Sequence, residues 1–143
     1  MKTIHQIGLT WTLLVLACGL SAKTAYAIKP FEKEFWKKYL EDNPNKDYVT
    51  LIKKKVKCNL CHDPNKRTDK GKKSKKFRNA YGTELSKLLD RKKDKKDTKK
   101  IQEALDKVAK MKSDPKDPKS PTYGDLIKQG KLPAGTPPEP TEK

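Results

Sequence analysis

The stretch Cys58-Asn59-Leu60-Cys61-His62 places two thiols and an imidazole within five residues. In a helical turn, positions i, i+3 and i+4 share one face, so these three side chains can all point at one flat ligand. This C-x-x-C-H pattern is typical of covalent haem attachment. The two thiols would form thioethers with the haem vinyl groups, and the imidazole would reach the iron from the proximal side.

Two other readings of the motif stay open. A C-x-x-C pair alone is also typical of a redox disulfide, but such a pair does not need the adjoining histidine. A structural zinc site requires four ligands, whereas the chain after residue 27 offers only Cys58, Cys61 and His62 as thiol or imidazole ligands. We therefore favour one covalent haem c, then a disulfide, then zinc.

The start of the chain has the layout of a secretory signal peptide. An uncharged apolar run of 14 residues from Ile7 to Leu20 follows Lys2, and Ala25-Tyr26-Ala27 supplies an A-x-A cleavage site. The run is shorter than the ~20 residues that span a membrane. Residues 1–27 are therefore predicted to be removed, and the protein to be periplasmic or otherwise exported, which is where haem c is attached.

Val15-Leu16-Ala17-Cys18 offers a second processing route, because it resembles a bacterial lipobox. Cleavage before Cys18 would leave a lipid-anchored protein, and membrane attachment is expected only in that case. The well-placed alanine site favours cleavage after Ala27 instead.

Composition limits what remains. Removal of 27 of the 143 residues leaves 116, enough for one small domain, and its charge is 33 basic minus 18 acidic residues, or +15. Nucleic acid is disfavoured as a partner because the protein is predicted to be exported and carries no nucleic-acid-binding motif. The positive charge has two possible roles. The lysine clusters would steer an acidic redox partner toward the protein, or they would only keep the surface well solvated.

Apolar spacing predicts helices over about 31–40, 47–58, 83–89, 98–110 and 122–129. Asp47 is a candidate N-cap of the second helix, and Asp97 or Thr98 of the fourth. No alternating strand pattern of useful length occurs, so the fold is predicted to be mostly α.

The segments between these helices are predicted to be irregular. The lysine-rich residues 63–76 are expected to form an exposed loop, and residues 91–97 a connector or a frayed helix end. Three prolines at every third position predict an extended or polyproline-like segment over 113–121. The domain is expected to cover residues 28–132 and a disordered, proline-rich tail residues 133–143.

The signal, the helix before the motif and Cys58-Asn59-Leu60-Cys61-His62 together resemble a small, single-haem c-type cytochrome. The resemblance implies a small helical domain packed around one covalent haem. It also implies an electron carrier rather than an enzyme, with thioethers on Cys58 and Cys61 and with His62 as proximal iron ligand. The second ring N–H of His62 is expected to be donated to a backbone carbonyl.

The sixth iron ligand is where the sequence departs from that family, which usually supplies a methionine from a loop beside proline. Met111 is the one methionine after residue 27 and follows the motif, but lysines flank it and no proline adjoins it. Lysine ligation and an open position that binds small ligands are the alternatives. Arg78 or Asn79 would either contact a haem propionate or act as a cap or surface residue. A haem-free basic binding module with a C-x-x-C disulfide is the remaining alternative function.

Overall fold

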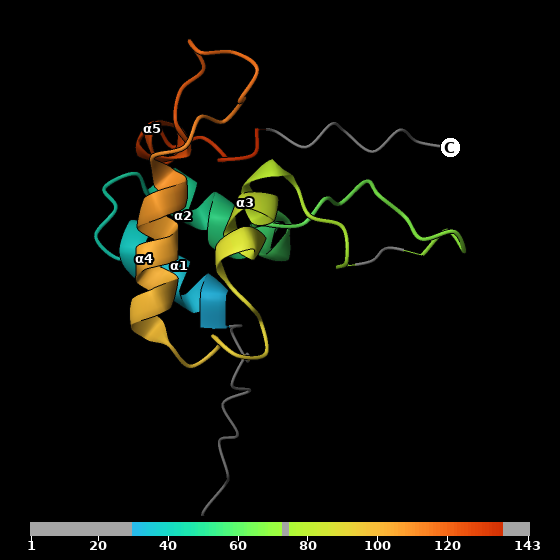
Figure 1. Ribbon diagram of the computed structural model, residues 1–143. Helices are drawn as coiled ribbons and strands as arrows, with labels where there is room; N and C mark the ends of the chain where they lie inside the picture. The colour runs from blue at the N-terminus through green and yellow to red at the C-terminus, as the bar shows by residue number, and fades with distance from the viewer. Residues whose placement is uncertain (1–29, 73–74, 136–143) are drawn as a thin grey trace, which may run out of the picture.

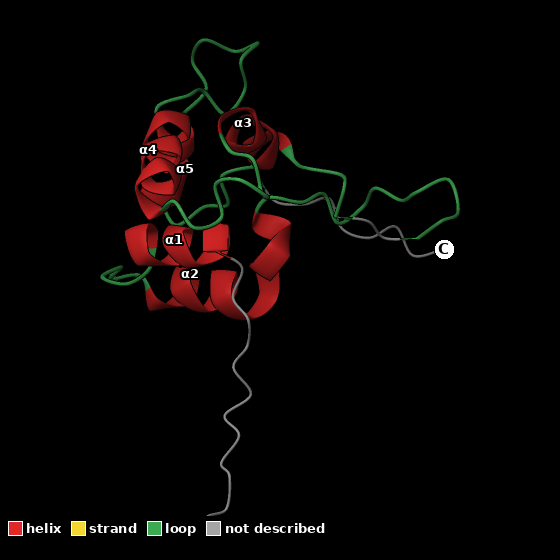
Figure 2. Ribbon diagram, turned by 60° about the horizontal axis from the view of Figure 1, so that its bottom comes forward, coloured by secondary structure: helices red, strands yellow, loops and turns green. Residues whose placement is uncertain are grey.

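The computed structural model describes residues 30–72 and 75–135, and the predicted signal peptide, Cys18 included, lies outside them. The longer helices are α1 (Pro30–Tyr39), α3 (Ala80–Leu88) and α4 (Thr98–Ala109) (Figures 1 and 2). Two short helices accompany them: α2 (Lys46–Thr50) follows α1, and α5 (Tyr123–Lys128) follows α4. The described residues contain no β-strand, only two isolated bridges. The predicted mostly α fold is confirmed. None of the described helices has the length and apolar character needed to cross a bilayer.

Helix α4 is the centre of the packing, and it contacts α1, α3 and α5. Its apolar positions recur every three or four residues, and all of them are buried, as the spacing predicts: Ile101, Ala104, Leu105 and Val108. The Asp97 side chain accepts a hydrogen bond from the Lys100 backbone N–H at 2.9 Å, so the predicted start of this helix is confirmed.

Polar contacts fix α1 across α4. The Gln102 side-chain amide donates to the buried Glu34 carboxylate at 2.7 Å and to the Glu34 backbone carbonyl at 3.2 Å. Lys38 pairs with Asp106 at 2.8 Å. Because the contacts lie 68 residues apart in sequence, they hold the first helix in one orientation over the fourth.

Three aromatic rings join α1, α3 and α5. The Tyr81 ring, which is completely buried, meets Phe35 and Tyr123 edge-on, with ring centroids 6.2 and 5.3 Å away. Such edge-to-face pairs add roughly 0.5–1.5 kcal/mol to the burial of each ring. This cluster packs the N-terminal half of α3 against the rest of the domain.

The segment before the motif differs from the single helix predicted over 47–58. Helix α2 begins at the cap Asn45 rather than Asp47, and it widens into a π-helix over Leu51–Val56 and then tightens into a 3₁₀ turn over Lys57–Leu60. The break falls at Lys57, whose φ is 46°. The prediction that one continuous α-helix leads into the motif is therefore wrong.

The apolar spacing of this segment gives a physical reason for the change. Its inward-facing residues recur at steps of four: Tyr48, Ile52, Val56 and Leu60. In an α-helix of 3.6 residues per turn, each step of four rotates the side chain by about 40°, so the last of them would leave the core. A wide turn followed by a tight one keeps the four residues on the same side.

The proline-rich connector over 113–121 is a closed loop rather than an extended segment. Ser113 and Pro121 lie at its base, where the Ser113 backbone N–H donates to the Pro121 carbonyl at 2.9 Å. Asp114 and Asp117 each accept a backbone N–H two residues later, which turns the chain locally. These aspartate turns outweigh the extended preference of the prolines. Of the predicted tail, only 133–135 is described, and Pro133 is buried against the domain.

Candidate cofactor-binding site

Cys58, Cys61 and His62 line one cavity, together with residues from α1, α3 and α4. Its volume is about 370 Å³, within the ~300–1,000 Å³ range of small-molecule sites. The motif thus presents its two thiols and its imidazole to one space, although it sits on a 3₁₀ turn and the residues after it rather than on an α-helix.

The walls and the rim of the cavity differ in chemistry. Large apolar side chains form the walls: Phe31, Phe35, Leu60, Leu85, Leu89, Ile101 and Leu105. Five cationic side chains also line it: Lys57, Lys75, Arg78, Arg91 and Lys95. Glu32 is the single carboxylate among the described lining residues. Such a cavity suits a large apolar ligand that carries acidic groups.

Asn79 ties the motif to the start of α3. Its side-chain amide donates to the carbonyls of Asn59 and Leu60, both at 3.0 Å, and its backbone N–H donates to the Cys61 carbonyl at 3.2 Å. Its side-chain oxygen accepts from the Gly82 backbone N–H at 2.9 Å, which caps α3. Helix α3 therefore begins at Ala80, three residues before the predicted start, and the expectation that Asn79 acts as a helix cap is confirmed.

Gly82 permits the closest approach in this region. A side-chain carbon at this position would overlap the backbone carbonyl of Cys61. Because the obstacle is backbone rather than a flexible side chain, the first turn of α3 can lie against the motif only with glycine here. The Tyr81-Gly82 dipeptide in the sequence gave no sign of this contact, which depends on the tertiary fold.

His62 is oriented by a backbone carbonyl, as predicted. Its Nδ1 lies 3.2 Å from the carbonyl oxygen of Phe77, which can only accept, so Nδ1 is the donor of this contact, and in a neutral ring the lone pair lies on Nε2. The Asp63 backbone N–H donates to the same oxygen at 3.2 Å, and His62 forms a bridge with Arg78. This is the arrangement that orients a metal-binding histidine.

The two thiols are not joined to each other. Burial raises the pKa of Cys61 to about 12, nearby Glu32 and Cys58 add to that increase, and Arg78 opposes it. In a redox C-x-x-C pair one thiol must ionise readily, because the thiolate is the nucleophile. The buried Cys61 thiol is not suited to that role.

The structure does not bring Met111 to the cavity. Its side chain is 36% exposed just beyond the end of α4, and it is absent from the cavity lining. Leu105, which does line the cavity, lies six residues earlier, about one helical turn before the end of α4 at Ala109. The Met111 carbonyl accepts from the Tyr123 backbone N–H at 3.0 Å, which joins this point to α5. The candidate distal ligand is thus placed elsewhere.

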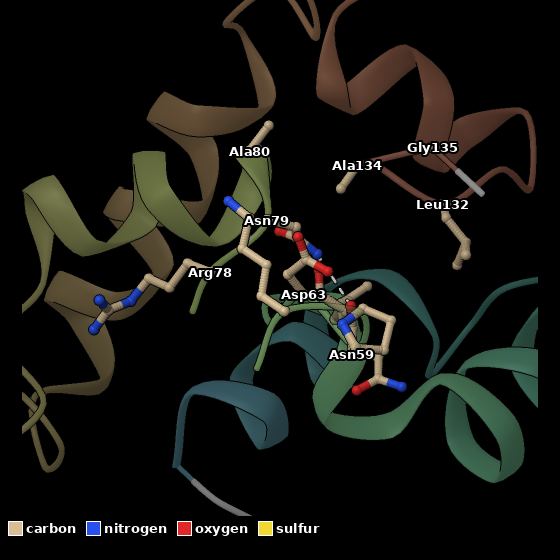
Figure 3. Close-up of a pocket in the computed structure, with 11 residues that line it drawn as sticks. Asn59, Asp63, Arg78, Asn79, Ala80, Leu132, Ala134 and Gly135 are labelled. Carbon is tan, nitrogen blue, oxygen red and sulfur yellow. Dashed lines mark hydrogen bonds between the residues drawn. The ribbon is translucent and has the colours of Figure 1, made fainter. Parts of the chain in front are cut away.

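A second, smaller cavity of about 280 Å³ lies beside the motif (Figure 3). Asn59, Asp63 and Asn79 face it, and Leu132 and Ala134 close it from the C-terminal side. The side chain of Arg78 extends away from these residues in Figure 3, and Arg78 also lines the larger cavity. None of the thiol or imidazole groups of the motif lines the small cavity.

Among residues 30–72 and 75–135, no three histidine, cysteine, aspartate or glutamate side chains gather into a metal-binding group. The four-ligand zinc reading thus has no support in the described part of the chain. A haem iron would need only the imidazole from the protein, since the porphyrin itself supplies four nitrogen ligands.

Comparisons with known proteins identify no relative: no family model, no curated protein and no solved structure matches the chain.

Proposed function

We propose that the protein is an exported, single-haem c-type cytochrome that carries electrons. The observation that supports it most is the convergence of Cys58, Cys61 and His62 on one largely apolar cavity whose charged lining groups are mainly cationic. The haem would supply an iron that cycles between the ferrous and ferric states. In this reading the protein is a carrier and not an enzyme.

The chain's own residues would hold the group in three ways. Cys58 and Cys61 provide the sulfurs for the two thioethers, at one end of the cavity. His62 offers Nε2, because the Phe77 carbonyl engages Nδ1–H. Phe35, Leu85 and the other wall residues would exclude water from a bound haem, and a drier setting raises the reduction potential.

Attachment is tested by purifying the mature protein from a host competent in cytochrome maturation. Intact mass should exceed that of the polypeptide by one haem, and the alkaline pyridine spectrum should show two saturated vinyl groups. The variant Cys58→Ser/Cys61→Ser is the matched control and should lose the covalent haem. A colourless wild-type protein with the mass of the polypeptide alone would refute the proposal. The alternative would then be a haem-free binding module with a Cys58–Cys61 disulfide.

A haem protein with an open sixth position is the second candidate, and the placement of Met111 favours it. The described residues that line the cavity include no methionine and no second histidine. Lys57, Lys75 and Lys95 are the remaining nitrogen bases that line it. Rapid, strong carbon monoxide binding to the reduced protein would support the open site, whereas slow or weak binding would indicate a protein ligand.

The partner of the carrier is proposed to be an acidic redox protein. Five cations against one carboxylate around the cavity favour encounter with a negative surface. The rate of electron transfer to such a partner should fall as ionic strength rises, because salt screens exposed charges beyond about 10 Å at 0.1 M. A rate independent of salt would remove this part of the proposal and leave a solvated surface as the role of the charge.

A further inference from the structure

The larger cavity has two chemically different ends. At one end Cys58, Cys61 and His62 lie against the first turn of α3, where Gly82 approaches the Cys61 carbonyl. The cavity then follows α3 to Leu89, seven residues later, or about 10 Å along the helix. Beyond Leu89 its lining continues into the connector between α3 and α4, drawn in yellow in Figure 1.

The connector is a built turn whose carboxylates are already engaged. Asp94 accepts from the Asp90 backbone N–H at 2.7 Å and pairs with Lys100 at 2.9 Å. Asp90 in turn accepts the backbone N–H groups of Lys92 and Lys93 at 2.7 and 2.9 Å. Both aspartates therefore serve to shape the turn.

Arg91 and Lys95 are the two connector cations that line the cavity, whereas Lys92 and Lys93 of the same turn do not. Neither Arg91 nor Lys95 forms an ion pair or a side-chain hydrogen bond with another described residue. Beyond the C-terminal end of α3, away from Gly82, the cavity lining thus includes two cationic groups without a protein counter-ion in the described part of the chain.

Haem carries its two vinyl groups on one edge and its two propionate carboxylates on the opposite edge. We propose that Arg91 and Lys95 bind the propionates, an assignment that rests on the proposed function. With the vinyl edge fixed at Cys58 and Cys61, the carboxylates fall at the connector. The guanidinium of Arg91 can engage one carboxylate through two parallel N–H bonds, and Lys95 offers a compact charge for the other.

The remaining cations that line the cavity are at the wrong end for this role. Lys57 directly precedes Cys58, and Arg78 lies close enough to Cys61 to influence its thiol. Lys75 belongs to the segment that reaches His62 through Phe77. The assignment therefore replaces Arg78 or Asn79, the sequence-based candidates for a propionate contact, with residues from a different loop.

The test compares Arg91→Gln and Lys95→Gln with the matched controls Lys92→Gln and Lys93→Gln in the haem-loaded mature protein. All four changes remove one charge from the same turn. We expect the propionate-bending bands in resonance Raman spectra to shift in the first pair and to stay at the wild-type position in the second. Equal spectra for all four variants would overturn the assignment.

A measurement on the wild type keeps the test independent of folding defects. The reduced iron is diamagnetic either when a protein group fills its sixth position in a low-spin state or when carbon monoxide does. In whichever of these forms the protein takes, propionate methylene protons should show nuclear Overhauser contacts with Arg91 and Lys95 side chains. Contacts with Lys57 or Arg78 instead would refute the assignment while leaving the haem in place. Absence of covalent haem would overturn the proposed function itself, so the two failures are distinguishable.

Discussion

The two ends of the larger cavity are built by different means. At the motif end, α3 packs closely against the backbone of the motif. Asn79 donates hydrogen bonds to three successive backbone carbonyls, and Gly82 allows contact with Cys61. At the connector end, a turn shaped by Asp90 and Asp94 extends charged side chains toward the cavity. The motif end fixes positions through hydrogen bonds to backbone carbonyls and close backbone packing, whereas the connector end supplies charge on long side chains that can adjust to a ligand.

The contrast predicts where substitutions have the largest effect. At the motif end, a lost hydrogen bond or an added methyl group displaces the chain that carries both thiols and the imidazole. At the connector end, loss of the cavity-lining charge of Arg91 or Lys95 leaves the backbone in place, because the turn is held by Asp90 and Asp94. Stability should therefore depend mainly on the first region, and ligand properties on the second.

Gly82→Ala should be the most damaging change. Helix propensity alone would make alanine better by about 1 kcal/mol, but the added carbon overlaps the Cys61 backbone carbonyl. Overpacking typically costs about 1–3 kcal/mol and occasionally more. Overlap with rigid backbone belongs above that range, at about 4 kcal/mol, so after the gain in helix propensity we expect a net loss of about 3 kcal/mol in urea unfolding. Gly71→Ala is the control, because its φ of 69° strains alanine but nothing lies within 4 Å. A loss no greater than that of Gly71→Ala would show that the two segments are not in contact.

Asn79→Ala should cost slightly less, about 2–3 kcal/mol, because it removes a helix cap worth about 1 kcal/mol and two hydrogen bonds of about 1 kcal/mol each. Asn79→Asp separates the two contributions, since it keeps the acceptor that caps α3 and loses the donor to Asn59 and Leu60. Asp97→Ala removes a cap that makes no such links and should cost about 1 kcal/mol. Equal losses for Asn79→Ala and Asp97→Ala in thermal unfolding would reduce Asn79 to a simple cap.

At the connector end, Asp94→Asn should reduce stability in a pH-dependent way. The hydrogen bond from Lys100, then that from the Asp90 backbone N–H, lower the pKa of Asp94 below its ordinary 3.8. The stability that the carboxylate contributes is therefore complete above about pH 4 and is lost as the pH falls through the lowered value.

Wild type and Asp94→Asn should consequently differ in urea midpoint near neutral pH and converge below the lowered pKa. Asp106→Asn is the matched control, because it breaks the ion pair between Asp106 of α4 and Lys38 of α1 without touching the connector. A difference that persists unchanged in acid would mean that Asp94 acts through shape and not through its charge.

The sequence predicts well those features that neighbouring residues determine. The apolar stripe of Ile101 and Leu105 and the cap at Asp97 locate α4 within a residue or two. The C-x-x-C-H spacing likewise brings Cys58, Cys61 and His62 to one cavity. These outcomes depend on periodicities and turn chemistry that operate over a few positions along the chain.

Features that depend on contact between distant segments could not be predicted in this way. Asn79 lies 19 and 20 residues from the carbonyls it holds, and its sequence neighbourhood resembles any helix start. The glycine at position 82 is required by a carbonyl 21 residues earlier. A signal was nevertheless present, because asparagine is a preferred N-cap residue, and Asn79 directly before Ala80 marks a capped start of α3 at Ala80 rather than Thr83.

Met111→Ala should have the smallest effect of all, since Met111 belongs to neither end of the cavity. We expect a stability change within about 0.5 kcal/mol, as for an exposed residue, together with unchanged absorption and magnetic spectra of the haem-loaded protein. To reach the cavity, Met111 would have to unwind the last turn of α4 and release the Tyr123 N–H that its carbonyl accepts. That movement would also separate Gly124 from Ala109, against whose backbone it packs. His62→Ala is the positive control, because it removes the proposed proximal nitrogen and should change the spectra. A spectral change in Met111→Ala equal to that of His62→Ala would mean that the chain rearranges around its ligand, and the open sixth position would then be excluded.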